Sequence, residues 1–502
     1  MIRFSLLSLF LSFCLAACAP LEPAELPEEV ALPKAHGLLW DSLATAHGDD
    51  WLVLLNDNAD ALDWRLQAID AAESAIDLQT FLWKVDTAGA AILEHLIQAA
   101  DRGVKVRILV DDALLVGDDA LVGYMFTHPN IEYRIYNPYG RRASSFAVRT
   151  ALNLAEFHRL DHRMHNKSMI VDGEIAIVGG RNLADEYFGL HQLTNFRDLE
   201  LLVGGLFVET LEHAFDAYWN DRWSVPVERL THLSPVVPDH RLLAAKAAEV
   251  GNVHAELADD ERVHAWRSML GRALDSDIRL LLDAPPTGNP ANAEEAPVQV
   301  ANELEQLFDR AEREIVIVSA YLIPTPDLEG AVERAIARGV SVRMLTNSIS
   351  STNHLSAHAA YRNHVGTLLR HGVALYEVRA DARDRHLYMN RPTDAKQLAL
   401  HAKALIIDSD KVFIGSANLD PRSLRINTEM GLLVTGTTLN ASLRDVLKPD
   451  FAAGNAWNLQ LGSDGRTRWV SGNTVLQAQP AATFMQRIED WLFATLPIED
   501  EL

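Results

Sequence analysis

The feature that most constrains this 502-residue chain is a short motif that occurs twice, once in each half. His165-Asn-Lys167-Ser-Met-Ile-Val-Asp172 and His401-Ala-Lys403-Ala-Leu-Ile-Ile-Asp408 both read H-x-K-x-x-x-x-D. A turn of small residues ending in asparagine follows each copy, Gly179-Gly-Arg-Asn182 and Gly415-Ser-Ala-Asn418, and equivalent positions differ by 401 − 165 = 236. One copy could arise by chance, but two copies in register indicate a duplicated unit. Two such half-sites can face each other across one shared site.

Each motif predicts a strand that runs into a hairpin. Short apolar runs flank Asp172-Gly173 in the first copy and Asp408-Ser-Asp410 in the second, a pattern typical of two strands joined by a tight turn. On a strand, residues i and i+2 share a face, so the histidine and lysine of each copy project together. The aspartate lies an odd number of residues from its histidine. We expect it at the strand end, where it holds the turn and does not touch substrate.

The residue types of the two motifs are suited to a phosphodiester. Lysine carries a compact positive charge that binds phosphate, and hydroxyl and amide groups can donate to the non-bridging oxygens. One histidine can attack phosphorus while the other protonates the leaving alkoxide, because the pKa of imidazole lies near neutrality. The candidate catalytic residues are therefore His165, Lys167, Asp172, His401, Lys403 and Asp408, and the candidate substrate-binding residues are Asn182, Ser416 and Asn418.

Two acidic residues downstream of the motifs are candidates for orienting the imidazoles. Asp198 follows the first motif and Glu429 follows the second. A carboxylate on one ring nitrogen would hold a histidine in the required tautomer; the alternative is that both are ordinary surface acids. Gly180 in the first half stands where Ser416 stands in the second, so the half-sites are not equivalent. This difference does not tell which histidine attacks.

The motifs are not accompanied by an arrangement typical of a metal centre. The chain has two cysteines, Cys14 and Cys18, and no H-E-x-x-H. We therefore predict phosphodiester transfer through a phosphohistidine, without a metal or other cofactor. His354 and His358, at helical i, i+4 spacing, could form a metal pair. Without a third ligand nearby, a helix that lines the site or the surface is favoured, with His358 near the substrate headgroup. We expect Arg163, beside the first motif, to contact either phosphate or solvent.

Together with the phrases around them, the motifs resemble the phospholipase D superfamily. The following segments are similar to its bacterial cardiolipin synthase branch, C-type: Arg163-Met-His165-Asn-Lys167-Ser, Gly179-Gly-Arg-Asn182, Leu345-Thr-Asn-Ser348, Gly415-Ser-Ala-Asn-Leu-Asp-Pro-Arg-Ser423 and Leu496-Pro-Ile-Glu. The resemblance covers nearly everything after about residue 38. It implies His165 as nucleophile and His401 as acid and base. It also implies two phospholipid substrates, with phosphatidylglycerol as acceptor and phosphatidylethanolamine as donor.

The duplication extends to the fold. A strand from about Glu73, a helical stretch and a strand ending at Val110 are matched by the same order from Glu312 to Leu345. This order predicts the α/β class, and the resemblance implies two pseudo-symmetric phospholipase D-like α/β/α sandwich domains with mixed sheets and one shared active site. The predicted organisation is a lipoprotein signal peptide at 1–17, a tether at 18–37, the first domain at 38–225, a linker or helical insertion at 226–298, the second domain at 299–455, and a C-terminal hairpin and helix at 456–502.

The N-terminus predicts export and a lipid anchor. An apolar stretch follows Arg3, and Leu15-Ala-Ala-Cys18 resembles the cleavage box of bacterial lipoproteins. Cys18 would then carry acyl chains that hold the protein to the membrane. An alanine directly after the cysteine, as at Ala19, resembles the sequence of lipoproteins sent to the outer membrane, so we expect the protein there, facing the periplasm. The alternative is an uncleaved membrane anchor. Because Cys14 leaves with the signal peptide and Cys18 is acylated, no disulfide is expected.

A formal net charge of −24 separates the candidate activities. Nucleases of the superfamily would use the same residues, but an acidic chain without a basic run offers no footprint for nucleic acid, so no nucleic-acid partner is expected. Three hypotheses remain: phosphatidyl transfer giving cardiolipin, phospholipase D-type hydrolysis with water as acceptor, and a binding lipoprotein with a dead site. Transferase and hydrolase differ in how well the acceptor pocket excludes water.

Overall fold

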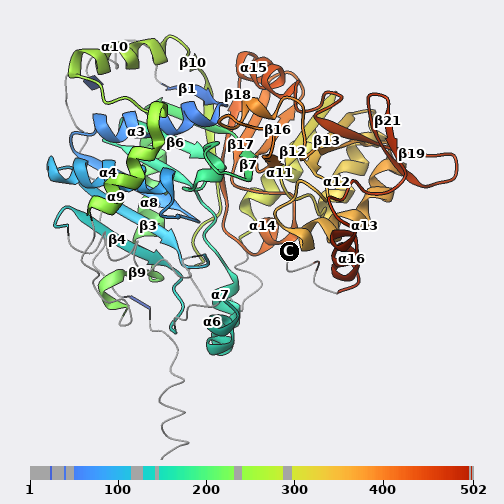
Figure 1. Cartoon of the computed structure of the whole chain (residues 1–502), viewed down its shortest axis with the longest axis horizontal. Coiled ribbons are helices and arrows are strands. Elements are labelled where there is room, and N and C mark those ends of the chain that lie inside the picture. The colour runs from blue at the N-terminus through green and yellow to red at the C-terminus, as the bar shows by residue number, and fades with distance from the viewer. Residues whose placement is uncertain are drawn as a thin grey trace, which may run out of the picture.

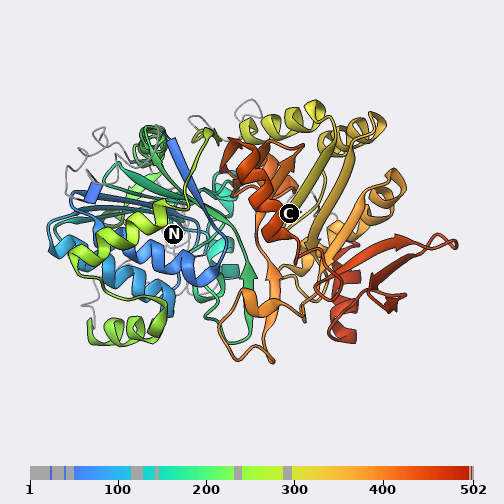
Figure 2. The same ribbon diagram turned by 90° about the horizontal axis from the view of Figure 1, so that it is seen from above.

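The computed structural model describes residues 23–24, 39–40, 50–114, 128–141, 146–230, 240–286, 297–496 and 499. The predicted signal peptide and Cys18 lie outside these residues. Figure 1 shows two α/β halves side by side, the first coloured blue to green and the second yellow to red, and Figure 2 shows the same division from above. Within the described part of the chain, no helix is both long enough and apolar enough to cross a membrane.

The first half is built on a nine-stranded mixed sheet. In spatial order its strands are β10 (Leu274–Asp275), β1 (Asp50–Leu55), β8 (Glu200–Gly205), β6 (Ile175–Gly179), β5 (Ser168–Val171), β2 (Ala75–Thr80), β3 (Lys105–Asp111), β4 (Ile131–Tyr136) and β9 (Ser224–Pro226). Strands β2, β3 and β4 run parallel, and β5, β6 and β8 continue the sheet from β2 in antiparallel pairs.

The second half repeats this arrangement in a ten-stranded sheet. Its strands are β11 (Asp277–Leu282), β18 (Met430–Thr435), β17 (Lys411–Gly415), β16 (Lys403–Ile407), β12 (Glu314–Ser319), β13 (Ser341–Asn347), β14 (Ala374–Val378), β19 (Ala456–Leu461), β20 (Thr467–Ser471) and β21 (Thr474–Leu476). The order β18-β17-β16-β12-β13-β14 has the same pairings and directions as β8-β6-β5-β2-β3-β4. The predicted duplication and the α/β class with mixed sheets are therefore confirmed.

Helices connect the parallel strands and cover the sheets. They are α3 (Asn58–Ala71), α4 (Thr87–Asp101), α6 (Phe146–Leu152), α7 (Phe157–Asp161), α8 (Phe207–Trp219), α9 (His240–Ala247), α10 (Asp259–Leu270), α11 (Gln299–Arg310), α12 (Pro326–Ala337), α13 (Leu355–His371), α14 (Pro421–Arg425), α15 (Thr437–Leu447) and α16 (Phe484–Phe493). The equivalent helices α4 and α12 both begin at a capping side chain: Asp86 accepts the Gly89 N–H at 3.2 Å, and Thr325 accepts the Leu328 N–H at 3.3 Å.

Alternation along the strands divides the apolar core into three layers. In β5, Met169 and Val171 pack against the outer helices of the first half, whereas Ile170 between them faces the second half. In β16, Leu405 packs outward and Ile406 faces the first half. The inner faces of both sheets, with α8 and α15, thus share one apolar layer. The ends of β5 and β16, which follow the two motif histidines, meet at this seam.

The region between the halves, predicted as a linker or helical insertion, contains the helices α9 and α10 and the strands β10 and β11. Its first strand, β10, pairs with β1 at the edge of the first sheet, and the next, β11, pairs with β18 at the edge of the second. Trp266 of α10 packs edge-to-face on Trp64 of α3, with ring centroids 5.1 Å apart. The described residues within 226–298 therefore belong partly to each half. The C-terminal hairpin also joins a sheet, because β19 pairs with β14.

Candidate active site

The histidine of the first motif meets an acid from the second half. The backbone N–H of His165 donates to the Thr428 carbonyl at 2.9 Å, so the second half runs alongside the motif. Glu429 comes next in the chain, and its Oε2 lies 2.8 Å from Nδ1 of His165. Ser416 donates its hydroxyl proton to this carboxylate at 2.5 Å and accepts the Met430 N–H at 3.0 Å. The carboxylate is held from two sides against the imidazole.

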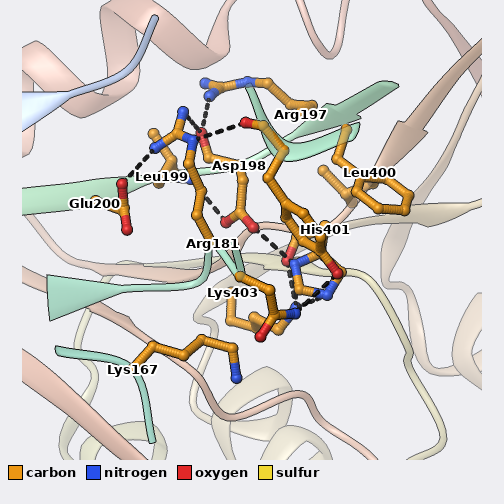
Figure 3. Close-up of polar contacts among 12 residues, drawn as sticks. Lys167, Arg181, Arg197, Asp198, Leu199, Glu200, Leu400, His401 and Lys403 are labelled. Atoms are coloured by element: carbon orange, nitrogen blue, oxygen red, sulfur yellow. Dashed lines mark hydrogen bonds and ion pairs between the residues drawn. The ribbon is translucent and has the colours of Figure 1, made fainter. Parts of the chain in front are cut away.

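The second motif has the reverse arrangement, shown in Figure 3. Strand β7 (Thr194–Arg197) pairs in parallel with β15 (Gln397–Leu400), and His401 donates its N–H to the Arg197 carbonyl at 2.9 Å. Asp198 follows, and its Oδ2 lies 2.6 Å from Nδ1 of His401. Each half therefore supplies the acid that orients the histidine of the other half. This leaves Nε2 of each ring as the nitrogen for chemistry.

The difference between Gly180 and Ser416 follows the difference between the two acids. A Cβ at Gly180 would lie 2.2 Å from Oδ1 of Asp198, so the shorter acid packs directly on the glycine. In the other half-site the longer Glu429 leaves room for Ser416, whose hydroxyl binds it. Ser416 is fully buried and its proton is directed to the carboxylate. The prediction that this hydroxyl donates to phosphate is corrected: Ser416 positions Glu429.

The two motif lysines lie beside their histidines, on the side that the strand spacing predicts. Lys167 Nζ donates to the His165 carbonyl at 2.6 Å and sits 5.5 Å from the centre of the Phe81 ring. Lys403 Nζ lies 3.0 Å from Nδ1 and 3.2 Å from Nε2 of His401, as Figure 3 shows. Both lysines are buried. The site therefore holds two cations within reach of the two imidazoles.

Burial governs the protonation of the imidazoles. It lowers the pKa of His165 to about 4, against the opposing charge of Glu429. Burial and Lys403 lower the pKa of His401 to about 3, against Asp198. Burial alone would raise the pKa of Asp198, but His401 and Lys403 outweigh it and lower that pKa to about 2. At neutral pH both imidazoles of the free protein are neutral, which the attacking nitrogen requires.

The lysines titrate much closer to neutrality than lysine does in water. Burial lowers the pKa of Lys167 to about 7, although Glu429 opposes it, and lowers the pKa of Lys403 to about 8, although Asp198 opposes it. In the empty site the charges of Asp198 and Glu429 are balanced by those of the two lysines. A bound phosphodiester would add one negative charge. That charge favours the protonated lysines and a proton on one imidazole.

The aspartates of the two motifs hold the strands that carry the histidines. Asp172 has a left-handed backbone (φ 56°), and its carboxylate accepts the backbone N–H groups of residues 73, 74 and 75 at 2.8 Å each. Asp408 has the same conformation (φ 51°) and accepts the N–H groups of residues 312, 313 and 314. These two aspartates thus bind the start of the neighbouring strand, as their position in the motif predicts; of the six candidate catalytic residues, His165 and His401 line the cavity, whereas the two lysines and the two aspartates are not among its lining residues.

Both histidines open on one cavity of about 330 Å³. Asn182 and Asn418 line it as well; Asn182 donates to the Tyr187 hydroxyl at 2.8 Å, whereas Oδ1 of Asn418 is a buried acceptor with no partner within the described residues. Both amide side chains therefore border the space that a ligand would fill. Sequence reasoning missed the ring-bearing wall of the cavity, which consists of Phe81, Tyr187, Phe196 and Tyr321. A signal for two of them was present, because the strand segments ending near Phe81 and Tyr321 occupy equivalent places in the duplication.

Three further residues were singled out in the sequence: His354, His358 and Arg163. His354 lines the cavity, but His358 does not; its Nδ1 lies 2.7 Å from Oδ1 of Asp490 on α16, in the interior. The pair therefore does not face one ligand. Arg163 is buried and donates to the Asn137 carbonyl at 3.0 Å, so it contacts neither phosphate nor solvent. Instead Arg422 reaches the cavity from α14 and pairs with Asp161 of the first half at 2.9 Å.

Comparison with known proteins gives a consistent family. The family model described as "Cardiolipin synthase, PLD-like domain" matches residues 66–219 and 304–450, one match in each half. Cardiolipin synthase C of Escherichia coli is 33% identical over 464 residues, which are 90% of this chain and 96% of that protein. The major cardiolipin synthase of Bacillus subtilis is 25% identical over 417 residues, 82% of this chain and 71% of that protein.

A solved structure shows the same fold. The phosphatidylserine synthase of Haemophilus influenzae superimposes with a TM-score of 0.52 at 13% identity, covering 82% of this chain and 90% of that one. Because the identity is low, this likeness concerns the arrangement of the two halves alone.

Proposed function

The chain belongs to the cardiolipin synthase family of phospholipase D-like proteins, and from this premise we propose that it transfers a phosphatidyl group from one phospholipid to another to form cardiolipin. The observation that carries the proposal is the crosswise pairing of His165 with Glu429 and of His401 with Asp198 around one cavity. A two-step transfer at phosphorus needs two oriented imidazoles facing one space, one neutral to attack and one protonated to act as the acid.

The first step forms a covalent intermediate. Nε2 of His165 bonds to phosphorus while the bond from phosphorus to the headgroup oxygen breaks, and His401 gives the leaving oxygen a proton. The negative phosphodiester beside His401 raises the pKa of that imidazole, so His401 takes up a proton from solvent as the substrate binds and then donates it to the leaving oxygen. Lys167 and Lys403 bind the non-bridging oxygens, and the side-chain N–H group of Asn418, which lines the cavity, adds a donor.

The second step returns both histidines to their starting state. A hydroxyl of the acceptor gives its proton to His401, and its oxygen attacks phosphorus as the bond to His165 breaks. With phosphatidylglycerol as acceptor and phosphatidylethanolamine as donor, the products are cardiolipin and ethanolamine. The rings of Phe81, Tyr187 and Tyr321 support transfer over hydrolysis, because an apolar wall disfavours water as the acceptor.

The proposal includes a membrane that faces the mouth of the cavity. Helix α16 is fixed to α13 by its polar side: Asp490 is fully buried and binds His358 and Arg362, at 2.7 and 2.6 Å. Its apolar residues point outward, with Phe484 74% and Trp491 59% exposed. A soluble helix has the opposite orientation, so this apolar face is suited to a lipid surface.

A second apolar edge lies across the cavity mouth from α16. Val148, Leu152, Leu154 and Phe157, on and between α6 and α7, are all exposed. Asp161 at the end of α7 binds Arg422 of the cavity, and the first turn of α13, which lies under α16, also lines the cavity. Figure 1 shows α6, α7 and α16 on the same lower side of the molecule. Apolar burial would offset the repulsion between this acidic protein and anionic lipids.

The anchor completes the proposed arrangement. Acylation at Cys18 after removal of the signal peptide would tether the chain to the envelope membrane, and the Glu- and Pro-rich segment after it would let the site reach the bilayer. Its support is the Leu15-Ala-Ala-Cys18 sequence. Placement in the outer membrane, facing the periplasm, rests on Ala19 and is part of the same proposal.

The test of the proposal is a product analysis. Purified full-length protein is incubated with vesicles of labelled phosphatidylglycerol, with and without phosphatidylethanolamine, and lipids are resolved by mass spectrometry. Cardiolipin and free ethanolamine should form, and the His165→Ala variant should form neither. His213→Ala, a histidine 74% exposed on α8, is the matched control and should keep full activity. Phosphatidic acid as the sole product would instead establish a hydrolase, and no lipid product at all would overturn both readings.

A further inference from the structure

A compact cluster of histidine and aspartate lies in the first half, on the outer helical layer. Asp63 and Asp70 belong to α3, His95 belongs to α4, and His254 lies in the segment between α9 and α10. None of the four is among the described residues that line the active-site cavity. The reaction outlined above does not use them.

The contacts in the cluster converge on one carboxylate. Oδ1 of Asp70 lies 2.6 Å from Nδ1 of His95, and Oδ2 lies 3.2 Å from Nε2 of His254. The two imidazole rings meet edge to face, with centroids 4.9 Å apart. The side chains of Asp70, His95 and His254 are 10, 12 and 7% exposed, so the cluster is enclosed but reaches the surface.

We propose that Asp70, His95 and His254 bind one divalent transition-metal ion, Zn²⁺ in the first place. One donor atom from each lies within 4.8 Å of the other two. Two imidazoles and one carboxylate are a donor set that zinc takes, with a water molecule as fourth ligand. Two ligands of tetrahedral zinc are about 3.3 Å apart, which the 3.2 Å contact meets. The shorter contact, 2.6 Å between Nδ1 of His95 and Oδ1 of Asp70, would have to widen to the same value when the ion binds.

The fourth residue of the cluster supports a metal in a second way. Oδ1 of Asp63 lies 2.8 Å from Nδ1 of His254, on the side of the ring away from Asp70. Histidines that bind metal through one nitrogen usually donate the other ring N–H to a carboxylate, which fixes the tautomer and the ring plane. Asp63 is in the place of that carboxylate, and Nε2 of His254 is then free to bind the ion.

The site has a structural consequence. Its three ligands come from positions 70, 95 and 254, so the ion would tie the segment after α9 to helices α3 and α4. Gln67 already donates to the Ala255 carbonyl at 3.0 Å at the same place. An unfolded chain brings these ligands together poorly, so binding favours the folded first half.

The experiment measures Zn²⁺ bound by the full-length protein after removal of metal with a chelator and titration with ZnCl₂. The unaltered protein and the exposed-histidine control His213→Ala should bind one equivalent more than His254→Ala and His95→Ala do. Asp63→Asn should keep that equivalent with an affinity 10–100-fold weaker, since it changes only the partner of a ligand. Substituting Co²⁺ should give the visible absorption of a four-coordinate imidazole site, and His254→Ala should lose it.

Several results would overturn the proposal. Equal stoichiometry and affinity in all these proteins would place any bound zinc elsewhere, and metal held by His165 and His401 would remain in His254→Ala. If a variant fails to fold, the proposal is tested on the unaltered protein alone. Its melting temperature should rise when ZnCl₂ is added and fall again when a chelator is added. If the melting temperature does not rise and no Co²⁺ absorption is seen, the cluster is held together by hydrogen bonds alone and binds no metal.

Discussion

Nδ1 of His165 lies 2.8 Å from Oε2 of Glu429, although 264 residues separate them. In the equivalent pair, Nδ1 of His401 lies 2.6 Å from Oδ2 of Asp198, and 203 residues separate the two. Both pairs cross from one half of the chain to the other. Neither half therefore contains a complete histidine–acid unit, and the two halves can act only together.

Glu429→Gln should lower kcat by about 10²–10⁴ with little change in KM. The amide of glutamine would donate to Nδ1, which places the ring proton on Nε2 and removes the attacking lone pair. The measurement is steady-state cardiolipin formation on vesicles.

Glu377→Gln is the matched control for that substitution. Glu377 is also a fully buried glutamate, held by Tyr361 and Trp469 in the second half, and burial raises its pKa to about 7, so a neutral amide resembles its protonated form. Its activity should stay within about threefold of the unaltered protein. Equal losses in both variants would mean that Glu429 acts through folding alone.

The two histidines should separate in a trapping experiment. A phosphatidyl ester of p-nitrophenol has a leaving group that needs no proton, so His401→Ala should still form the covalent intermediate and release one equivalent of nitrophenol. His165→Ala should release none above background, because it lacks the attacking nitrogen. Quenched protein is digested and the modified residue is identified by mass spectrometry. Label on residue 401 in the unaltered protein would reverse the two roles.

For release of nitrophenol from the same p-nitrophenyl ester, which needs no proton from His401, kcat/KM should fall on both sides of a range near pH 5–7. His165 must be neutral to attack, and its pKa is lowered to about 4, so kcat/KM is lost as the pH falls through that value. Lys167 must be charged to hold phosphate, and its pKa is lowered to about 7, so kcat/KM falls by about tenfold per unit as the pH rises beyond it. Lys167→Arg, where active, should lose the alkaline decline. A rate that climbs steadily to pH 9 would contradict this assignment.

The asymmetry of the half-sites predicts unequal effects of small substitutions. Gly180→Ala places a Cβ 2.2 Å from Asp198 and must displace that carboxylate from His401, so kcat should fall about 100-fold. Ser416→Ala removes one hydrogen bond to Glu429 and should cost about tenfold. Gly330→Ala, on an exposed helix where the nearest atom is the end of a flexible arginine, is the control and should be neutral. Circular dichroism checks that the folded fraction is unchanged.

Local patterns allowed much of the fold to be predicted, and long-range pairing explains what they missed. The spacing of His165 and Lys167 on one strand and the Asp172 turn follow from neighbours in the chain, so the sequence carries them. Which acid faces which histidine depends on how the halves dock, and no local pattern reports that. For the same reason the cluster at Asp70 was missed, because its ligands come from three separate segments.

Other errors have a different physical cause. Ser416 has the right chemistry to donate to phosphate, but its proton goes to a carboxylate that lies 13 positions further along and closer in space. The prediction of a linker or helical insertion at 226–298 did not include β10, which has only two residues, or β11, which has six; each lies at a sheet edge. A C-terminal helix was expected within 456–502, but the periodicity of its apolar residues does not tell which side of α16 is buried.

The outward apolar face of α16 leads to the last prediction. Replacing Phe484 and Trp491 together by glutamate should weaken binding to phosphatidylglycerol vesicles about 100-fold or more, since each ring would otherwise contribute roughly 1.5–3 kcal/mol on entering lipid. Both side chains are more than half exposed, so the folded protein loses little, and activity on a short-chain lipid dissolved as monomers should be preserved. Val475→Glu introduces the same charge at an apolar position 53% exposed on β21, away from the cavity mouth, and should leave vesicle binding intact. Equal loss on vesicles and on the dissolved lipid would show that the double variant damages the site and not the membrane contact. Flotation with vesicles should use protein without acyl chains, so that the contact made by α16 is measured apart from the anchor proposed at Cys18.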